Sequence, residues 1–411
     1  MAVSGERIYS TLKTIAFTRP AGTQTEREAA GVISNEVRAL GFVPQLEPFE
    51  IDEAEAVGEL KVLAPYEKTY FVPAFKHAKS TPVEGVTAEF LYCDDASEAN
   101  FKELQGKLCL FNNLTCDVKK LAELGVLGML QMDGKATDKP EEVDLYQAEF
   151  RKEETRELLP AFTISGRDAL ELVKRGATKV WFRLKNHSYK AQSQNVVVTV
   201  PGTELPEEII AIGAHYDSVP VGQGACDNGA GAAILLELLR AFTENGPRRT
   251  LRFIWFGAEE IGLFGSKAYL AEHEAELKNY RLMINVDVGG SIMGRNFVRA
   301  TAEESVVHYI EFLAKEVGYI ADVKQGLMGS DSTPFADKKV PAVGFGRGEA
   351  SALQFCHSRH DTMDYISAKA LGDTAAFVLL FVERMCAARI FPIPPTIPDN
   401  IVKRVDEMLG K

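Results

Sequence analysis

Acidic and histidine side chains occur in the middle of this chain where three apolar runs end. The runs are residues 209–214, 251–258 and 281–288. The side chains that follow or close them are His215, Asp217, Glu259, Glu260 and Asp287. Nitrogen and carboxylate ligands of this kind suit Zn²⁺ and its neighbours, and a catalytic zinc keeps one position open for water. The sequence therefore predicts a catalytic metal site that needs no cysteine ligand.

His215 and Asp217 lie two residues apart at one strand end, so their side chains point to the same side. One can bind a metal while the other orients it, because metal-bound histidines usually donate their second ring nitrogen to a neighbouring group. A single histidine at a strand end is more often structural, but this spacing favours a metal site.

Glu259 and Glu260 are adjacent carboxylates that follow a run we expect to be buried. One of them can bind a metal while the other takes a proton from metal-activated water. Asp287 is acidic within an otherwise apolar strand. Since a buried, unpaired carboxylate is costly, Asp287 needs a metal or another partner.

Asp227 lies at the start of a helical pattern that ends at Gly246-Pro247, and it allows two interpretations. It can cap the helix, it can bind a metal at a helix N-terminus that favours anions, or it can do both. Small residues around it let the backbone approach a ligand closely. Far downstream, the sequence CHSRHDT offers His357 and His360, and the residues alone do not choose between them.

The elements that must position these side chains alternate between apolar strands and helices from about residue 192 onward. Such alternation indicates a parallel sheet covered on both faces, in which ligands bind at the carboxyl ends of the strands. We expect an α/β fold with a mixed, mostly parallel sheet covered by helices on both faces. Between residues 54 and 186 short strands predominate. We interpret residues 54–186 as a β-rich α+β lobe inserted into a catalytic domain made of residues 1–53 and 187–411.

Three local signals predict further elements. Thr25 and Glu28 form a capping box for a helix that stops at Gly41. Ser165 caps a helix that stops at Gly176. A C-terminal helix carries an apolar side, which we expect to pack on its own domain rather than mediate self-association.

Composition excludes several classes of protein. The 411 residues carry a formal net charge of −12, so there is no basic footprint for nucleic acid. The N-terminal sequence is too charged for a signal peptide, and charges interrupt the most apolar late stretch, residues 375–390. We therefore expect a cytoplasmic protein without a membrane segment. Its six cysteines, at positions 93, 109, 116, 226, 356 and 386, are expected to be reduced.

Taken together, these motifs resemble the M28 family of co-catalytic zinc aminopeptidases. The family pattern reads His-x-Asp, Asp-Asn-Gly/Ala, Glu-Glu, Asp and His-x-x-x-Asp-Thr, and the chain follows this order between residues 211 and 362. The resemblance implies two Zn²⁺ ions per chain, with Co²⁺ or Mn²⁺ as substitutes. His215 and Asp287 would hold one ion, and Glu260 and His357 the other. Asp227 would bridge the two ions.

The same resemblance implies the remaining roles. Glu259 would be the general base, Asp217 would orient His215, and the family spacing selects His357 from the two downstream histidines. The expected reaction is hydrolysis of the N-terminal peptide bond of a peptide with a free N-terminus. A hydroxide held between the two ions would attack the peptide carbonyl.

Two other functions stay open. A metallo-carboxypeptidase or another amidase can use the same scaffold, and Arg347 is then the candidate cation for a substrate carboxylate. A non-catalytic binding protein is the alternative from a different class. It predicts a substitution in the ligand set, and the chain has none. The oligomeric state is not predicted.

Two departures and one further resemblance complete the prediction. Cys226 stands where the family often has an acidic residue, and Cys356 precedes the expected ligand His357. These thiols are either separate core residues or neighbours that make the site sensitive to oxidants. Asp331 either caps a helix or lies around the metal ligands. The inserted lobe resembles a protease-associated domain, which would shape the cleft or bind a partner.

Overall fold

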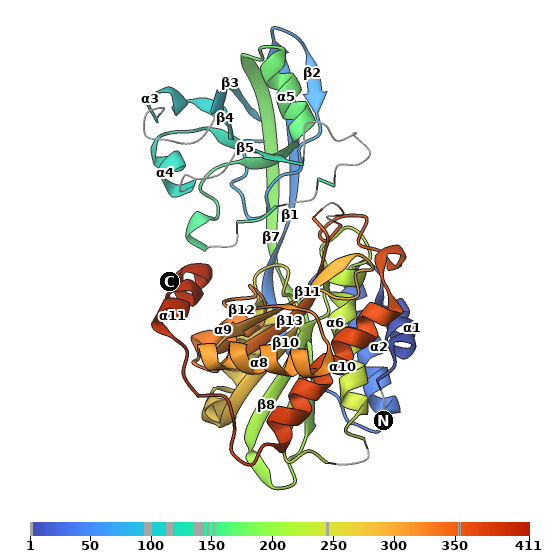
Figure 1. Cartoon of the computed structure of the whole chain (residues 1–411). Helices are drawn as coiled ribbons and strands as arrows, with labels where there is room; N and C mark the ends of the chain where they lie inside the picture. Colours follow the sequence, from blue (N-terminus) through green and yellow to red (C-terminus); the bar gives the residue numbers. More distant parts are fainter. Residues whose placement is uncertain are drawn as a thin grey trace. The chain divides into compact units, whose positions relative to one another are not determined.

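The chain forms two compact units in the computed structural model (Figure 1). One unit comprises Met1–Ile51 and Gln192–Lys411, and the other comprises Asp52–Ala191. The chain passes from one unit to the other within strands β1 (Gln45–Ala64) and β7 (Lys179–Val200). The structure describes residues 3–93, 101–111, 118–134, 144–145, 148–150, 153–243, 246–351, 353 and 355–411.

The first unit alternates strands and helices along most of its length. Its helices are α1 (Gly5–Ile15), α2 (Gln24–Ala39), α6 (Ala230–Arg240), α7 (Phe264–Glu272), α8 (Glu304–Val317), α9 (Ser332–Asp337), α10 (Ala368–Ala387) and α11 (Asp399–Leu409). Its further strands are β8 (Leu205–His215), β9 (Arg249–Phe256), β10 (Tyr280–Val286), β11 (Gly294–Thr301), β12 (Asp322–Gln325) and β13 (Ala342–Glu349). A π-helical turn, Ala225–Gly229, precedes α6.

The sheet of this unit has the strand order β12-β11-β13-β10-β8-β9-β7. Strands β13, β10, β8 and β9 pair in parallel, as do β11 and β12. Only the β11–β13 and β7–β9 pairs of this order are antiparallel. The prediction of a mixed, mostly parallel sheet is therefore confirmed.

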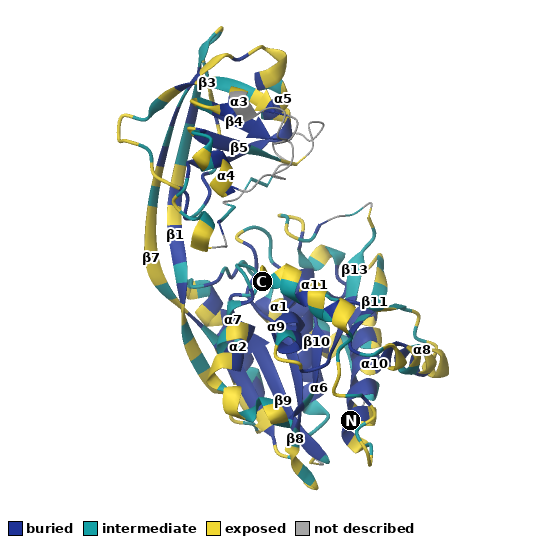
Figure 2. Ribbon diagram, turned by 90° about the vertical axis from the view of Figure 1, so that its left-hand side faces the viewer, coloured by how far each residue is buried: buried dark blue, intermediate teal, exposed yellow. Residues whose placement is uncertain are grey.

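Side chains on the central strands alternate between two hydrophobic cores, one on each face of the sheet. Ile210 and Ile212 of β8 belong to the larger core, which also contains buried residues of α1, α2, α6, α8 and α10. Ala211 of the same strand belongs to a smaller core with Tyr269 of α7 and Phe335 of α9. Figure 2 accordingly shows β9 and β10 almost entirely buried. Both faces are covered, as the continuous apolar runs predicted.

The second unit is rich in strands and has its own core. Its elements are β2 (Lys68–Tyr70), β3 (Val86–Cys93), α3 (Phe101–Leu104), β4 (Lys107–Phe111), α4 (Val118–Glu123), β5 (Gly128–Asp133), β6 (Ala161–Ser165) and α5 (Gly166–Lys174). The strand order is β7-β3-β4-β5-β6, with β3 to β6 parallel and β1 paired with β2 and β7. Phe111, Phe162 and Phe182 are fully buried in its core. The resemblance to a protease-associated domain stays a prediction.

The predicted boundaries of two helices are confirmed, but one cap is wrong. Helix α2 ends before Gly41, whose φ of +87° is in the left-handed region that glycine adopts readily. Its cap is Thr23, whose hydroxyl accepts the Glu26 amide, and not the predicted Thr25 two residues later. Both TxxE spacings occur in the sequence, so spacing alone could not select the cap. Helix α5 begins after its cap Ser165, as predicted.

Helix α11 packs on its own unit through buried Ile401 and Val405, and Thr333 donates a hydrogen bond to Met408 at its end. Among the described helices, none combines the length and apolar composition needed to cross a membrane.

Arg249 at the start of β9 connects the sheet to the end of α10. Its side chain is 1% exposed, donates to a Glu208 carboxylate oxygen at 2.6 Å, and donates to the Cys386 carbonyl at 2.9 Å. A buried guanidinium with charged and carbonyl partners stabilises the fold mainly because its partners would otherwise be left unpaired.

Replacing Arg249 by Leu should lower the free energy of unfolding by about 3 kcal/mol, because Glu208 and the carbonyls at the end of α10 lose their donor. Urea unfolding followed by tryptophan fluorescence measures this, since Trp255 lies in the same strand. The control is Arg248→Leu, whose pair with Glu204 has side chains 30% and 60% exposed and should contribute under about 1 kcal/mol. Equal losses in both variants would contradict the prediction.

Candidate metal centre

Parallel pairing brings the carboxyl ends of β8, β9 and β10 to one edge of the sheet. His215, the last residue of β8, pairs with Phe256, the last residue of β9. Asp287 follows β10 directly, and Glu259 follows β9 by three residues. The residues that the sequence places at three strand ends therefore meet in space.

Two histidines face the two oxygen atoms of one carboxylate, Asp227. The Nε2 atom of His215 lies 3.2 Å from Asp227 Oδ1 and 3.2 Å from Asp287 Oδ1. The Nε2 atom of His357 lies 3.1 Å from Asp227 Oδ2 and 3.2 Å from Glu260 Oε2. Each half of the site thus has one imidazole, one oxygen of Asp227 and one further carboxylate.

This geometry fits zinc. Ligand atoms about 2.0–2.2 Å from a tetrahedral zinc lie roughly 3.3 Å from one another, close to the separations within each half. His215, Asp227 and Glu260 also place one ligand atom each within 4.8 Å of one another. The donor set of imidazole nitrogen and carboxylate oxygen suits zinc and its neighbours.

The acidic surroundings hold both histidines in their charged form. Burial lowers the pKa of His215, but the charges of Asp287 and Glu259 outweigh it, so that pKa lies well above its usual range. Hydrogen bonds to Asp227 and Glu260 raise the pKa of His357 to about 11. Burial alone would raise the pKa of Asp227, yet the two histidines bring it well below its usual range. The site attracts cations, and metal ions would compete with these protons.

Asp227 does not cap helix α6. The N-cap residue is Gly229, and beside it the Asn228 Oδ1 atom accepts the Gly231 amide at 2.9 Å while its Nδ2 atom donates to the Val286 carbonyl. The Asp227 carboxylate is left to face the histidines, so the interpretation as a helix cap is wrong.

Asp361 holds the backbone at Asp227, a role that sequence reasoning missed. Its carboxylate accepts the Cys226 amide at 2.7 Å and the Asp227 amide at 3.0 Å. Burial raises the pKa of Asp361 to about 7, although these two hydrogen bonds oppose the effect. The available signal was its place in the motif that contains His357.

Asp217 accepts the backbone amides of both neighbouring glutamates. Glu259 N lies 3.0 Å from Asp217 Oδ1, and Glu260 N lies 3.1 Å from Asp217 Oδ2. The Nδ1 atom of His215 is 3.5 Å from Oδ1. Asp217 therefore fixes the turn that carries Glu259 and Glu260, and its orienting role toward His215 stays a prediction.

Arg19 is a fully buried cation among these acidic groups, and no sequence pattern pointed to it. Its guanidinium donates to the carbonyls of Tyr216, Gln223 and Gly224, which lie on both sides of the turn before Asp227. Burial lowers the pKa of Arg19, while the charges of nearby aspartates, including Asp217, oppose the effect.

Glu259 is not among the carboxylates that face the two histidines at 3.1–3.2 Å. Burial raises the pKa of Glu259 well above its usual range. The charge of His215 lowers this pKa, whereas the charge of Asp287 raises it further. A carboxylate with a raised pKa is suited to general base chemistry near neutral pH. Ala258, Val288 and His357 have φ of +54°, +52° and +57°, so the backbone is strained at the site.

The structure does not bring every candidate into the site. His360 is exposed, and among the described ion pairs it has none with the carboxylates of the site, whereas His357 pairs with Asp227 and Glu260. Asp331 precedes α9 but makes no cap hydrogen bond. Burial raises its pKa to about 7, and the charge of Asp287 contributes, while its place around the metal ligands stays a prediction. None of the described cysteines forms a disulfide, and Cys116 lies outside the described residues.

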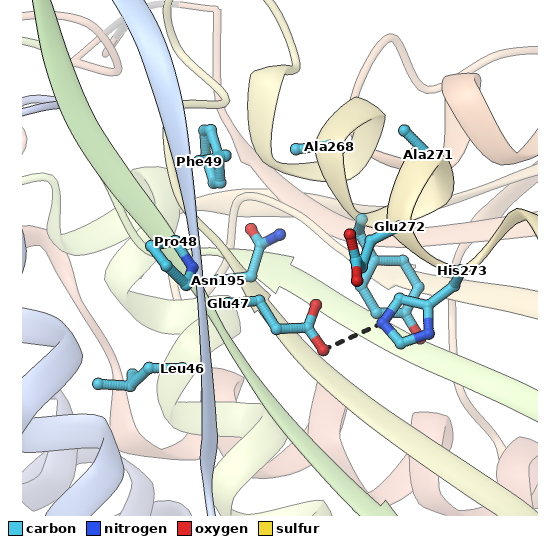
Figure 3. Close-up of a pocket in the computed structure, with 10 residues that line it drawn as sticks. Leu46, Glu47, Pro48, Phe49, Asn195, Ala268, Ala271, Glu272 and His273 are labelled. Atoms are coloured by element: carbon cyan, nitrogen blue, oxygen red, sulfur yellow. Dashed lines mark hydrogen bonds and ion pairs between the residues drawn. The ribbon is translucent and has the colours of Figure 1, made fainter.

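A cavity of about 620 Å³ lies in the same unit and contains none of the candidate ligands (Figure 3). Glu47 and His273 face each other in it, with Oε1 and Nε2 3.0 Å apart. Asn195, which also lines it, accepts the Gly257 amide next to the turn that carries Glu259. The lining of this cavity is therefore distinct from the candidate metal centre.

Comparison with known proteins finds a peptidase family that part of this chain resembles. Residues 195–382 match the model of peptidase family M28. Carboxypeptidase Q of Bos taurus is 27% identical over 91% of this chain and 83% of its own length. Aminopeptidase YwaD of Bacillus subtilis is 26% identical over 90% of this chain and 82% of its own length. The solved structure of BSAP, a zinc aminopeptidase from Bacillus subtilis, has a TM-score of 0.78 at 22% identity and covers 97% of this chain and 99% of its own.

The family match spans the strand ends and loops that form the candidate metal centre, and the solved structure shares the fold of the chain. Residues 195–382 therefore resemble a peptidase family M28 domain, and the similarity of most of the chain to known peptidases supports a peptide hydrolase.

Proposed function

We propose that the chain is a di-zinc aminopeptidase that removes the N-terminal residue of peptides. The observation that carries the proposal is the Asp227 carboxylate, whose two oxygen atoms each face a different histidine at 3.1–3.2 Å. Two ions would use both halves of the site, with the Asp227 carboxylate between them.

Five side chains would hold the ions. His215 and Asp287 belong to one, Glu260 and His357 to the other, and Asp227 to both. When bound, zinc lowers the pKa of water and polarises a carbonyl oxygen. Co²⁺ and Mn²⁺ accept the same donors and are expected substitutes.

Glu259 is the proposed general base. Its carboxylate takes a proton from the attacking water and returns it to the leaving amine as the peptide bond breaks. Asp217 positions Glu259 through the backbone amide that it accepts. The raised pKa of Glu259 supports this role, because the protonated form must also be accessible at the end of the reaction.

A metallo-carboxypeptidase is the second candidate, and the likeness to carboxypeptidase Q favours it. Such an enzyme needs a cation for the substrate carboxylate. Arg347 was the sequence candidate, but its Nε atom donates to the Ser291 carbonyl at 2.7 Å and one Nη atom to Asn296 at 2.9 Å. A guanidinium used in this way supports the loop after β10, which favours the aminopeptidase.

Two substrates separate the candidates. Leucyl-anilide has a free amine and no carboxylate, and an N-acetylated dipeptide has a free carboxylate and no amine. We expect zinc-loaded protein to release aniline from the first and to leave the second intact. Chelator treatment should abolish turnover, and Zn²⁺ or Co²⁺ should restore it. Metal-dependent cleavage of the acetylated dipeptide alone would replace the proposal by the carboxypeptidase.

Substituting Glu259 by Gln should lower kcat by about 10²–10⁴-fold while both zinc ions stay bound, because the amide cannot accept the proton. Steady-state kinetics and metal analysis of the same sample measure the two quantities. Glu304→Gln changes an exposed glutamate in the first turn of α8 and should leave both unchanged. A fully active Glu259→Gln enzyme would rule out the proposed base.

Substituting Asp361 by Asn should weaken metal binding by about 10–100-fold, since one of the two amides that hold Cys226 and Asp227 loses its acceptor. Competition with a chromophoric chelator measures the affinity. Asp364→Asn, three residues away and outside these hydrogen bonds, is the matched control. Equal metal affinity in the wild type, Asp361→Asn and Asp364→Asn would show that Asp361 does not position Asp227.

A further inference from the structure

Two cysteines and a glutamate meet beside the candidate zinc ligands and take no part in the proposed reaction. Cys226, Cys356 and Glu349 place one sulfur or oxygen atom each within 4.8 Å of one another. Cys356 Sγ donates to Glu349 Oε2 at 3.0 Å. Neither thiol is part of a disulfide. The sequence left open whether they meet, and the structure brings them together.

The three side chains come from three separate segments. Cys226 lies in the π-helical turn before α6, Glu349 closes β13, and Cys356 lies in the following loop. Cys226 is fully buried, whereas Cys356 and Glu349 are half-buried. The three side chains therefore already lie close together, although they come from separate segments.

The chemistry of the cluster suits a thiophilic divalent cation. Zinc takes thiolate sulfur at about 2.3 Å and carboxylate oxygen at about 2.0–2.2 Å, so donors within the observed spacing can close on one ion with small movements. Soft sulfur ligands select zinc over calcium or magnesium, and water can fill the fourth position. The carboxylate adds the negative charge that favours cation binding.

We propose that Cys226, Cys356 and Glu349 form an additional metal site that binds Zn²⁺ or a similarly thiophilic ion. Two of its ligands are adjacent in sequence to Asp227 and His357, so the ion joins the two segments that present these side chains. The bound ion would hold these two segments together. Its three ligands are different side chains from those of the candidate zinc centre, and sulfur is its main donor.

The test is a titration of the full-length holoprotein with Cd²⁺ after treatment with a phosphine reductant. Sulfur-to-cadmium charge transfer absorbs in the ultraviolet, and imidazole or carboxylate ligands do not give this band. We expect a band that saturates at one equivalent. It should be lost in Cys356→Ser and weakened in Glu349→Gln. Cys386→Ser and Cys109→Ser, which change buried thiols elsewhere, should keep it.

Absence of the band from reduced wild-type protein would overturn the proposal, and so would a band that survives Cys356→Ser. Reduction before the titration ensures that a disulfide between Cys226 and Cys356 cannot hide the site. Alkylation provides a measurement on the unmodified sequence. Cd²⁺ should slow the reaction of Cys356 with iodoacetamide several-fold, read by mass spectrometry of its peptide, and an unchanged rate would contradict the site.

Discussion

The site depends on one buried carboxylate that is shared between two imidazoles. A carboxylate in such surroundings keeps its charge only where cations or donors face both of its oxygen atoms. His215 and His357 do this for Asp227 from opposite sides. Whatever fixes the backbone at Asp227 therefore fixes the spacing of the two halves. Asp361 does so through two amides, and Arg19 does so through carbonyls of the preceding turn. Asp217 likewise accepts the backbone amides of Glu259 and Glu260, so several buried carboxylates around the site hold its backbone in place.

Most of the candidate ligands could be predicted because parallel strands expose their carboxyl ends at one edge. Asp287 and Glu260 needed only the recognition of an apolar run and of the acidic residue at its end. His357 lies in an irregular loop after β13, with φ in the left-handed region, and no periodicity places such a loop in space. Arg19 bonds to backbone carbonyls, and Asp361 to backbone amides. Any residue type can supply a backbone amide or carbonyl. The sequence therefore does not show which residues Arg19 and Asp361 contact.

The fold of the first unit was more predictable than its local caps. Strand β8 alternates side chains between two apolar cores, and a run that is apolar on both sides has few other solutions. Helix caps depend on single hydrogen bonds, so two candidate threonines two residues apart are nearly equivalent in sequence. Thr23 caps α2 because Glu26 turns back to accept the Gly22 amide at 2.7 Å and the Ser193 hydroxyl at 2.6 Å. A long-range partner, Ser193, thus decides a local boundary.

The turn that carries Asp227 is held from two directions, so the position of this carboxylate does not rest on a single contact. On one side the Asp361 carboxylate binds the backbone at Cys226 and Asp227. On the other, the Cys226 side chain meets Cys356 and Glu349. Position 226 is often acidic in proteins with this motif, and an acidic residue there could not supply the second sulfur for a soft ion at Cys356. The two cysteines are therefore expected to occur together in related sequences, because either thiol alone would leave the proposed metal site with one sulfur ligand.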